Sequence, residues 1–500
     1  MTALERAIAR PDPVRDFGSR SPLHGLDRRS VGFVDVLAQS VAAVAPAAAA
    51  TTVVLLVAGI SPSATVLSIL LAGVLSFLVA RTITQFARRF AVAGSTYTYT
   101  ARGLGAGAGL ASGAAILVGY GAIAMFALFG GAYYLTFLLG EIFPGTSGPV
   151  VTAFVLLAEA GFVALVLVRG IRVSSRIALV VEVISVTLIV VMLIILLVQI
   201  GPIDPAVLVP AVGEWSPAAI AAGSVIALTA FVGFESSATL GVEARSPLRT
   251  VPRAIVWTVI LSGGLYLVAS VAQVAGFAAM GENLAESASP INELAAAYGM
   301  GGWAILADAG IAASFLACAI GSTTALTRVL FTMGRDGVLP RVAGRTHRRF
   351  GTPIGAIWLS LPVITIAPLL LTVAGIEIRD AMHVTIALGG VGYIVAYILV
   401  CVSAPVFLRR IGELTLSAAV VAGVSAIALT GALIAFLVVD AASGSLAIWI
   451  VLFVALVAGV IITMRIRDDR RSLDGIGAYD EPVASQVLGG VARDGRATDD

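Results

Sequence analysis

The stretch AFVGFESS at residues 230–237 decides the fold, because it places a carboxylate in the middle of an apolar segment. The surrounding run, about residues 216–240, has the length of a membrane-spanning helix. Within it, Glu235 lies two residues after Gly233 and directly before two serines. A membrane helix can unwind at such a point where protein or water satisfies the freed backbone groups. We therefore expect a broken membrane helix here.

The composition of the whole chain is typical of a membrane protein. Its 500 residues are 59% hydrophobic and 12% charged, and their mean hydropathy is +1.02. A soluble domain carries roughly a quarter charged residues, so the lipid bilayer is the expected surroundings. The two cysteines and three histidines are scattered, which excludes a disulfide scaffold and a Cys/His metal cluster. A net charge of +2 gives no indication of a nucleic-acid partner, and no cofactor is expected.

Apolar runs of about 20 residues predict twelve membrane-spanning helices. They lie at about 35–59, 64–86, 112–139, 149–168, 174–200, 216–240, 253–279, 303–328, 354–375, 383–408, 415–439 and 444–464. No charge lies between Asp35 and Arg81, so we expect the chain to fold back at residues 60–63. The prediction is an all-α membrane protein with polar tails at residues 1–32 and 466–500, neither of which is expected to pack a core.

The arginines test this helix count independently. Short cytoplasmic loops collect basic residues, and all 31 basic residues of this chain are arginine. With both termini in the cytoplasm, twelve spans place every arginine except Arg379 on the inner side. A missed or surplus helix would invert everything after it. The alternation therefore favours twelve spans in the plasma membrane with both termini cytoplasmic.

Four carboxylates fall within the predicted spans: Glu159, Glu182, Glu235 and Asp308. Each costs a few kcal/mol at the bilayer centre unless it is paired, protonated or facing water. Two interpretations stay open for each of them. They line a path for substrate or protons, or they form hydrogen bonds between helices.

A second broken helix is expected in the first span. At residues 45–47, in the sequence Ala-Pro-Ala, proline removes a backbone donor and clashes with the preceding turn. Two broken helices in corresponding positions of two halves indicate a transport site near the membrane midplane. The predicted substrate-binding residues are Ala45, Pro46, Ala47, Thr229, Phe231, Gly233, Phe234 and Glu235.

Three pieces of sequence between residues 33 and 410 resemble a known transporter group. The first is FVGFE at 231–235 with EARSP at 243–247 and VPRAI at 251–255. The second is Arg328 with MGRDGVLP at 333–340 and GTP at 351–353, and the third is FARR at 86–89 with AGSTYTY at 93–99. In this order and spacing, the pieces resemble the amino acid-polyamine-organocation transporter superfamily.

The resemblance implies the LeuT-type fold. Its five-plus-five inverted repeat would cover about residues 33–200 and 216–410, with two additional helices at 411–465. It also implies that exposed backbone at the two breaks holds the carboxylate and the amine of a small-molecule substrate, as free N–H groups and carbonyls at half-helix ends are suited to do.

The function that follows is secondary active import of an amino acid by alternating access, and not an enzymatic reaction. The alternatives are a polyamine or organic-cation carrier, a sodium-coupled symporter of the same fold, and a membrane sensor derived from a transporter.

The chain departs from the family's pattern at two places. The Gly-Ser-Gly break of the first helix is replaced by residues 45–47, which leaves less room and one donor fewer. Many proton-coupled relatives carry a lysine in the fifth helix at the position that corresponds to Ser185, and this chain contains no lysine. Another group must therefore couple transport to an ion gradient, although Ser185 stays among the candidates.

The remaining coupling candidates are two carboxylates and two hydroxyls. Glu235 and Glu182 are candidates for binding a proton, since a carboxyl group can titrate as a cavity opens and closes. Ser322 and Thr323 are candidates for an oxygen-rich sodium site, or for ordinary hydrogen bonds within their helix. We favour proton coupling through Glu235. Tyr97, in an arginine-bearing inner loop, is the candidate cytoplasmic gate.

Overall fold

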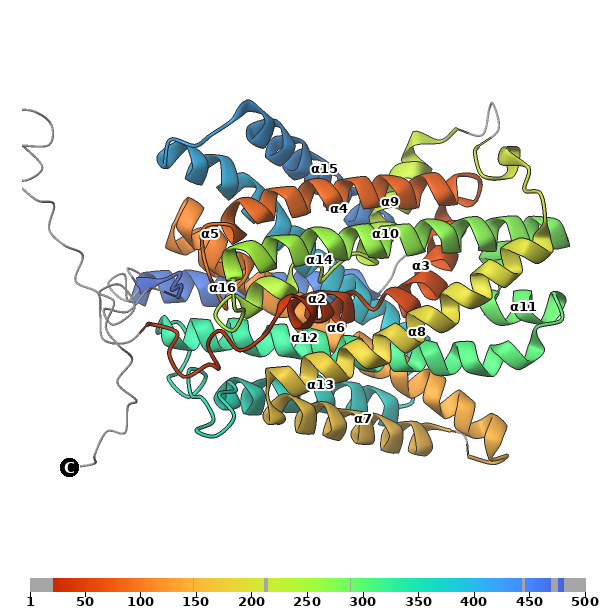
Figure 1. Cartoon of the computed structure of the whole chain (residues 1–500), viewed down its shortest axis with the longest axis horizontal. Helices are drawn as coiled ribbons and strands as arrows, with labels where there is room; N and C mark the ends of the chain where they lie inside the picture. The colour runs from red at the N-terminus through yellow and green to blue at the C-terminus, as the bar shows by residue number, and fades with distance from the viewer. Residues whose placement is uncertain are drawn as a thin grey trace, which may run out of the picture.

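The structure is a computed structural model that describes residues 21–146, 148–210, 215–287, 289–442, 446–468 and 475–480. These residues form helices and loops, and the only β-type pairing among them is an isolated bridge between Val31 and Ala244. The long helices run side by side along one common direction (Figure 1). The predicted all-α architecture is therefore confirmed.

Eleven helical stretches of the described residues are long and apolar enough to cross a membrane. They are α2 (Phe33–Val44) joined to α3 (Pro46–Ile60), α4 (Thr65–Ala87), α6 (Ala106–Ile142), α7 (Pro149–Arg169), α8 (Ile171–Ile200), α10 (Pro247–Met280), α12 (Gly301–Arg335), α13 (Ile354–Val373), α14 (Ile378–Arg410), α15 (Leu416–Ala442) and α16 (Leu446–Asp468). The predicted turn at residues 60–63 is present, where Ser61 and a short 3-10 helix, η1 (Pro62–Ala64), separate α3 from α4.

The predicted span at 216–240 has a different form from the other eleven. Its regular part, α9 (Pro217–Thr229), is only 13 residues long. The rest consists of turns and a 3-10 helix, η3 (Ser236–Leu240). A helix of 13 residues rises about 20 Å, which is less than the hydrocarbon core of a bilayer. This span is interrupted where the sequence places Gly233 and Glu235.

Short helices mark the two ends of the bundle. α5 (Thr96–Leu104) lies at one end and α11 (Pro290–Ala297) at the other (Figure 1). Two further 3-10 helices, η2 (Pro205–Val207) and η4 (Leu284–Glu286), lie in the connections. We refer to the two ends as the α5 end and the α11 end.

α6 is the central helix and packs most extensively against α12 and α14. Glycines on α6 make this close approach possible. A Cβ atom on Gly119 would lie 3.0 Å from the ring of Tyr393, and one on Gly130 would lie 2.6 Å from the ring of Phe315. Small residues at such crossings let membrane helices pack closely without a hydrophobic driving force.

The prediction that the polar tails do not pack is wrong for residues 21–32 and 475–480. Leu23 and Leu26 are buried in one apolar cluster with Ala478, and Ile476 is buried as well. These apolar residues are spaced among charged and glycine residues, so composition alone did not reveal them. The other tail residues, 1–20, 469–474 and 481–500, lie outside the described residues.

Candidate functional site

The first span is broken at Ala45, as predicted. α2 ends at Val44, and Ala45 adopts a left-handed conformation with φ 50° and ψ 61°. Its N–H group donates to the carbonyls of Val41 and Ala42, both at 3.1 Å. α3 then begins with Pro46, whose missing N–H group would have had no partner in a first turn. A left-handed alanine costs about 1–2 kcal/mol, so packing around the break must hold it in place.

The second break, between Thr229 and Ser236, lies directly against the first span. Gly233 has φ +97°, and a Cβ atom there would come within 3.0 Å of the carbonyl oxygen of Ala43. The N–H group of Ser237 donates to the hydroxyl of Ser40 at 2.9 Å. Glycine is required at position 233 for both conformation and space. The two breaks therefore form one contiguous region.

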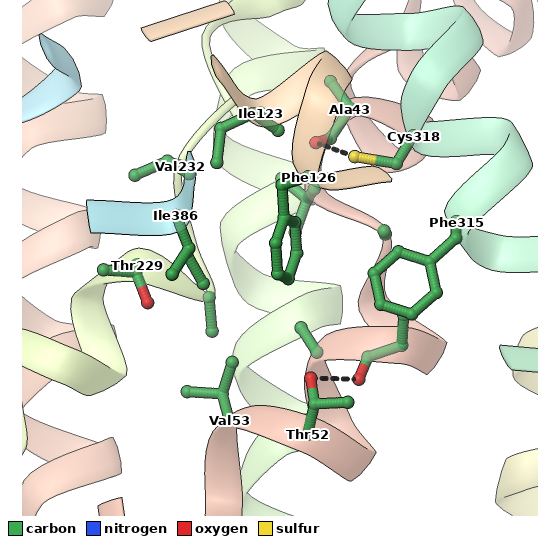
Figure 2. A pocket seen from close by; sticks show the side chains of 15 residues that line it. Ala43, Thr52, Val53, Ile123, Phe126, Thr229, Val232, Phe315, Cys318 and Ile386 are labelled. Atoms are coloured by element: carbon green, nitrogen blue, oxygen red, sulfur yellow. Dashed lines mark hydrogen bonds between the residues drawn. The ribbon is translucent and has the colours of Figure 1, made fainter. Parts of the chain in front are cut away.

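A pocket lies where the two breaks meet (Figure 2). Its lining comes from α2, α3, α6, the second break, α12 and α14. The residues are Ala43, Val44, Ala45, Ala48, Ala49, Thr52, Val53, Ile123, Phe126, Thr229, Ala230, Val232, Phe315, Cys318 and Ile386. The lining is apolar apart from two threonines and a cysteine. Its free volume is about 30 Å³, room for no more than about two water molecules, so the pocket is too small for an amino acid in this conformation.

A much larger cavity of about 400 Å³ lies beyond this pocket on the side of the α11 end. It shares Thr52, Phe126 and Ile386 with the central pocket. Arg379 and His383 line it too. Figure 2 shows the Phe126 ring projecting into the central pocket. Access from the α11 end is therefore obstructed by little more than the side chains that the two cavities share.

Two of the predicted substrate-binding residues, Ala45 and Thr229, line the pocket. Phe231 instead packs edge-on against Tyr266, with ring centroids 5.0 Å apart. Phe234 packs against a tyrosine of α14 at 5.2 Å. Phe231 and Phe234, which were predicted to bind substrate, therefore pack behind the second break and are not among the residues that line the pocket.

Glu235 is fully buried and held by two tyrosines. The Tyr120 hydroxyl of α6 donates to Oε1 at 2.7 Å, and the Tyr397 hydroxyl of α14 donates to Oε2. Tyr397 also accepts a 3.4 Å hydrogen bond from the N–H group of Gly233. Both carboxylate oxygens have a partner, so the carboxylate fastens the break to α6 and α14. Sequence reasoning missed the two tyrosines, because nothing in the spacing of three distant segments relates them.

Glu182 of α8 lies at the N-terminus of α3. Its Oε1 accepts hydrogen bonds from the N–H group of Ala47 at 3.4 Å and from the Ser314 hydroxyl at 2.9 Å. The Ser314 hydroxyl also accepts from the N–H group of Ala48 at 3.3 Å. A carboxylate is stabilised at the positive end of a helix dipole. One turn later, Ser185 donates to the Val181 carbonyl of its own helix.

The hydroxyls considered for sodium lie on α12 opposite α2. The Cys318 thiol donates to the Ala43 carbonyl at 3.3 Å and lies 3.8 Å from the Ser322 hydroxyl. Thr323 is buried, and its hydroxyl has no hydrogen-bond partner among the described residues. A Cβ atom on Gly321 would lie 2.7 Å from the Ala43 nitrogen, so the two helix backbones touch here.

The other two carboxylates within spans lie outside the central pocket. Glu159 of α7 is buried against Gly131, and neither of its oxygens has a hydrogen-bond partner in the described part of the chain. Asp308 of α12 accepts from the Asn292 amide at 3.0 and 3.3 Å. The interpretation as an interhelical hydrogen bond therefore describes Asp308 well.

Residues from the three pieces of sequence that resemble the transporter superfamily lie together at the α5 end. Arg328 forms a bidentate ion pair with Glu243, with N–O distances of 2.9 and 2.7 Å and side chains 4% and 1% exposed. The Tyr97 hydroxyl donates to Asp336 at 2.7 Å. Burial raises the pKa of the Asp336 carboxyl above its usual range, although the hydrogen bond from Tyr97 opposes this shift. These pairs join the loop behind η3 to α12, and α12 to α5.

A profile described as amino acid permease matches residues 35–475. The chain belongs to the amino acid permease family. An uncharacterized transporter of Mycobacterium tuberculosis (strain ATCC 25618 / H37Rv) is 32% identical over 127 residues, which cover 25% of this permease and 28% of that relative. The branched-chain amino acid permease of Lactococcus lactis subsp. cremoris (strain MG1363) is 26% identical over 324 residues, which cover 60% of this permease and 67% of that relative.

Among solved structures, MhsT in complex with L-phenylalanine has the same fold. It matches this permease with a TM-score of 0.53 at 17% identity, covering 82% of this chain and 99% of that one. The match confirms the LeuT-like class of fold that the motifs imply. The permease is thus a multi-pass membrane protein of a transporter family.

Proposed function

We propose that this permease imports an apolar amino acid across the plasma membrane by alternating access, as a secondary active transporter. The observation that carries the proposal is the meeting of two broken helices at one apolar pocket. The proposed topology has twelve spans with both termini and the α5 end in the cytoplasm. Residues 33–200 and 216–410 form the two repeats, and residues 411–465 form two additional helices.

The first turn of α3 would receive the substrate carboxylate. Backbone N–H groups at a helix start, together with the positive end of its dipole, attract an anion. In this conformation the N–H groups of Ala47 and Ala48 are engaged by Glu182 and Ser314 at distances of 3.4 and 3.3 Å. Such long hydrogen bonds are weak and are readily exchanged for a substrate carboxylate.

The substrate side chain would lie among the apolar residues of α3, α6 and α12. Val53, Ile123 and Phe315 present only hydrocarbon to it. The relative from Lactococcus lactis is named a branched-chain amino acid permease, and this supports the same class for the present chain. A polyamine would need a carboxylate facing the pocket, and none of the pocket-lining residues in the described part is acidic.

Proton coupling is proposed, with Glu182 and Glu235 as the two candidate groups. Ionised Glu182 and the substrate carboxylate would compete for the same end of α3, so protonation of Glu182 would favour substrate binding. Glu235 already has a tyrosine partner on each oxygen. The contacts favour Glu182 over Glu235, which reverses the preference drawn from the sequence.

Sodium coupling is the less favoured alternative. The Ala43 carbonyl beside Ser322 accepts a hydrogen bond from the Cys318 thiol. Hard cations such as sodium prefer oxygen ligands, and a thiol is a poor substitute. A membrane sensor is the non-transport alternative.

Uptake into proteoliposomes tests the proposed function. Radiolabelled leucine, isoleucine and valine should accumulate when an inward proton gradient is imposed, and unlabelled arginine or putrescine in excess should not compete. Inhibition by putrescine would favour the polyamine alternative. Binding of leucine without any accumulation would favour a sensor, and dependence on sodium at constant pH and membrane potential would refute proton coupling.

A further inference from the structure

Residues 475–480, with the sequence GIGAYD, return to the bundle after α16 and pack against its α5 end. The last part of α16 already lies there, since Arg465 donates to the Gly337 carbonyl at 2.6 Å. Gly477 has φ +90°, and a Cβ atom there would lie 3.1 Å from the Cβ atom of Ala101 on α5. The segment therefore approaches α5 as closely as its backbone allows.

The backbone of this segment supplies hydrogen bonds to a buried carboxylate. Asp336, at the end of α12, accepts from the N–H groups of Gly477 and Ala478 at 2.8 and 3.5 Å. The same oxygen accepts from the Tyr97 hydroxyl. Asp336 thus joins α12, α5 and the returning segment at a single atom, and removal of the segment would take donors from a buried group.

A second set of contacts fixes Tyr479 over the loop that follows α4. Arg102 of α5 donates from Nε to the Gly477 carbonyl at 2.9 Å. The Arg102 guanidinium lies 4.5 Å from the centre of the Tyr479 ring. That ring meets Phe90 edge-on at 5.1 Å. The segment is therefore clamped between α5 and the end of α4.

The carboxylate of Asp480 binds side chains of the N-terminal region. It accepts from the Ser21 hydroxyl at 2.8 Å and pairs with Arg28 and Arg29, each at 2.8 Å. The Asp480 side chain is fully buried, so this charge depends on its partners. Arg29 also donates to the Gly241 carbonyl at 3.0 Å, at the end of η3. One residue of the C-terminal region thereby links the N-terminal region to the broken sixth span.

We propose that residues 475–480 are a latch that holds the α5 end closed and has to detach before the pocket opens to the cytoplasm. The proposal rests on the proposed function, since it assigns the latch a place in alternating access. Its contacts join the N-terminal region, α5, the loop after α4 and the end of α12, and Arg29 extends them to the residue after η3. These elements have to separate for a passage to form between them. A segment that binds only the closed arrangement biases the equilibrium toward it.

Labelling of Cys318 from the cytoplasmic side tests the latch. Cys318 lines the central pocket, and the other cysteine, Cys401, is buried in α14 and is replaced by serine as background. In inside-out vesicles, Asp480→Asn should raise the rate of Cys318 labelling by an impermeant maleimide at least about tenfold, because it removes the charge that pairs with Arg28 and Arg29. Asp27→Asn is the matched control, since Asp27 is half exposed and makes only a 3.8 Å ion pair.

A reversible cross-link tests the latch in the opposite direction, because it prevents the segment from detaching. Cysteines that replace Phe90 and Tyr479, whose rings meet edge-on at 5.1 Å, should form a disulfide that keeps the latch attached. Uptake of leucine should then fall at least tenfold on oxidation and return on reduction, while leucine binding persists. Equal Cys318 labelling in Asp480→Asn and the parent protein, or full uptake by the oxidised form, would overturn the latch. Failure of the parent protein to take up any amino acid would instead count against the proposed function.

Discussion

The two ends of the bundle differ in how they close the central pocket. Toward the α11 end, a cavity of about 400 Å³ reaches the pocket and is separated from it mainly by Phe126 and Ile386. Toward the α5 end, the ion pair of Arg328 with Glu243 and the hydrogen bonds at Asp336 join several elements. A thin apolar barrier at one end and a polar network at the other indicate a conformation that is closer to opening at the α11 end, which is the outer end in the proposed topology.

The largest expected effect is a difference between the two ends of the bundle in the labelling of single cysteines from outside the cell. Gly281 and Gly412 both have positive φ angles and no neighbouring atoms that a side chain would meet. In the proposed topology, Gly281 follows α10 outside the cell and Gly412 follows α14 inside. A single cysteine at Gly281 should react with an impermeant thiol reagent in whole cells, and one at Gly412 should react only after lysis. Labelling of Gly412 in intact cells would contradict the twelve-span topology.

At the second break, which lies between the two ends of the bundle, Gly233→Leu should abolish uptake. The glycine has φ +97°, and any side chain there meets the Ala43 carbonyl, so the break cannot keep its shape. Leucine uptake into proteoliposomes is the measurement. Gly264→Leu is the matched control, because Gly264 has open space around it on α10. Normal uptake by Gly233→Leu would remove the site from this break.

The polar network at the α5 end should contribute to stability. Glu243→Gln leaves Arg328 buried without its counter-charge and should lower the free energy of unfolding by about 3–5 kcal/mol. The exposed pair of Arg89 with Glu413 is the control, and Glu413→Gln should change it by about 0–1 kcal/mol. Denaturant unfolding in detergent measures both. Equal effects of the two substitutions would show that the network is not specially stabilising.

Sequence reasoning predicted the breaks but not the side chains that hold them. Pro46 and Gly233 have local conformational consequences that can be read from neighbouring residues, and both breaks are present. Tyr120 and Tyr397 meet Glu235 only because α6 and α14 cross behind the second break. Such long-range contacts leave no periodic signal. Asp336 was visible within a motif, but its partners at residues 477 and 478 were not.

Substitutions at the two buried carboxylates, Glu182 and Glu235, should differ in their effect on proton coupling. Glu182→Gln removes the ionised competitor at the start of α3 and should abolish the acceleration of leucine uptake by an inward proton gradient, while counterflow persists. Glu235→Gln keeps a group that can hydrogen-bond to Tyr120 and Tyr397, so it should retain the acceleration. Uptake and counterflow in the same proteoliposomes measure both properties. Loss of acceleration only in Glu235→Gln would restore the preference drawn from the sequence.

The smallest expected effect concerns the thin barrier at the α11 end. Phe126→Ala enlarges the central pocket toward the cavity at the α11 end, so larger apolar side chains should fit. One methylene group more or less in an apolar pocket changes discrimination by roughly tenfold or somewhat more, and we expect the preference for phenylalanine over valine to rise by about tenfold. Phe137→Ala is the matched control, since Phe137 lies on the same helix and is 48% exposed. Competition of each amino acid against labelled leucine gives the ratio. An unchanged ratio in Phe126→Ala would mean that this ring does not limit the size of the substrate, and the boundary between the two cavities would then have to lie at other side chains.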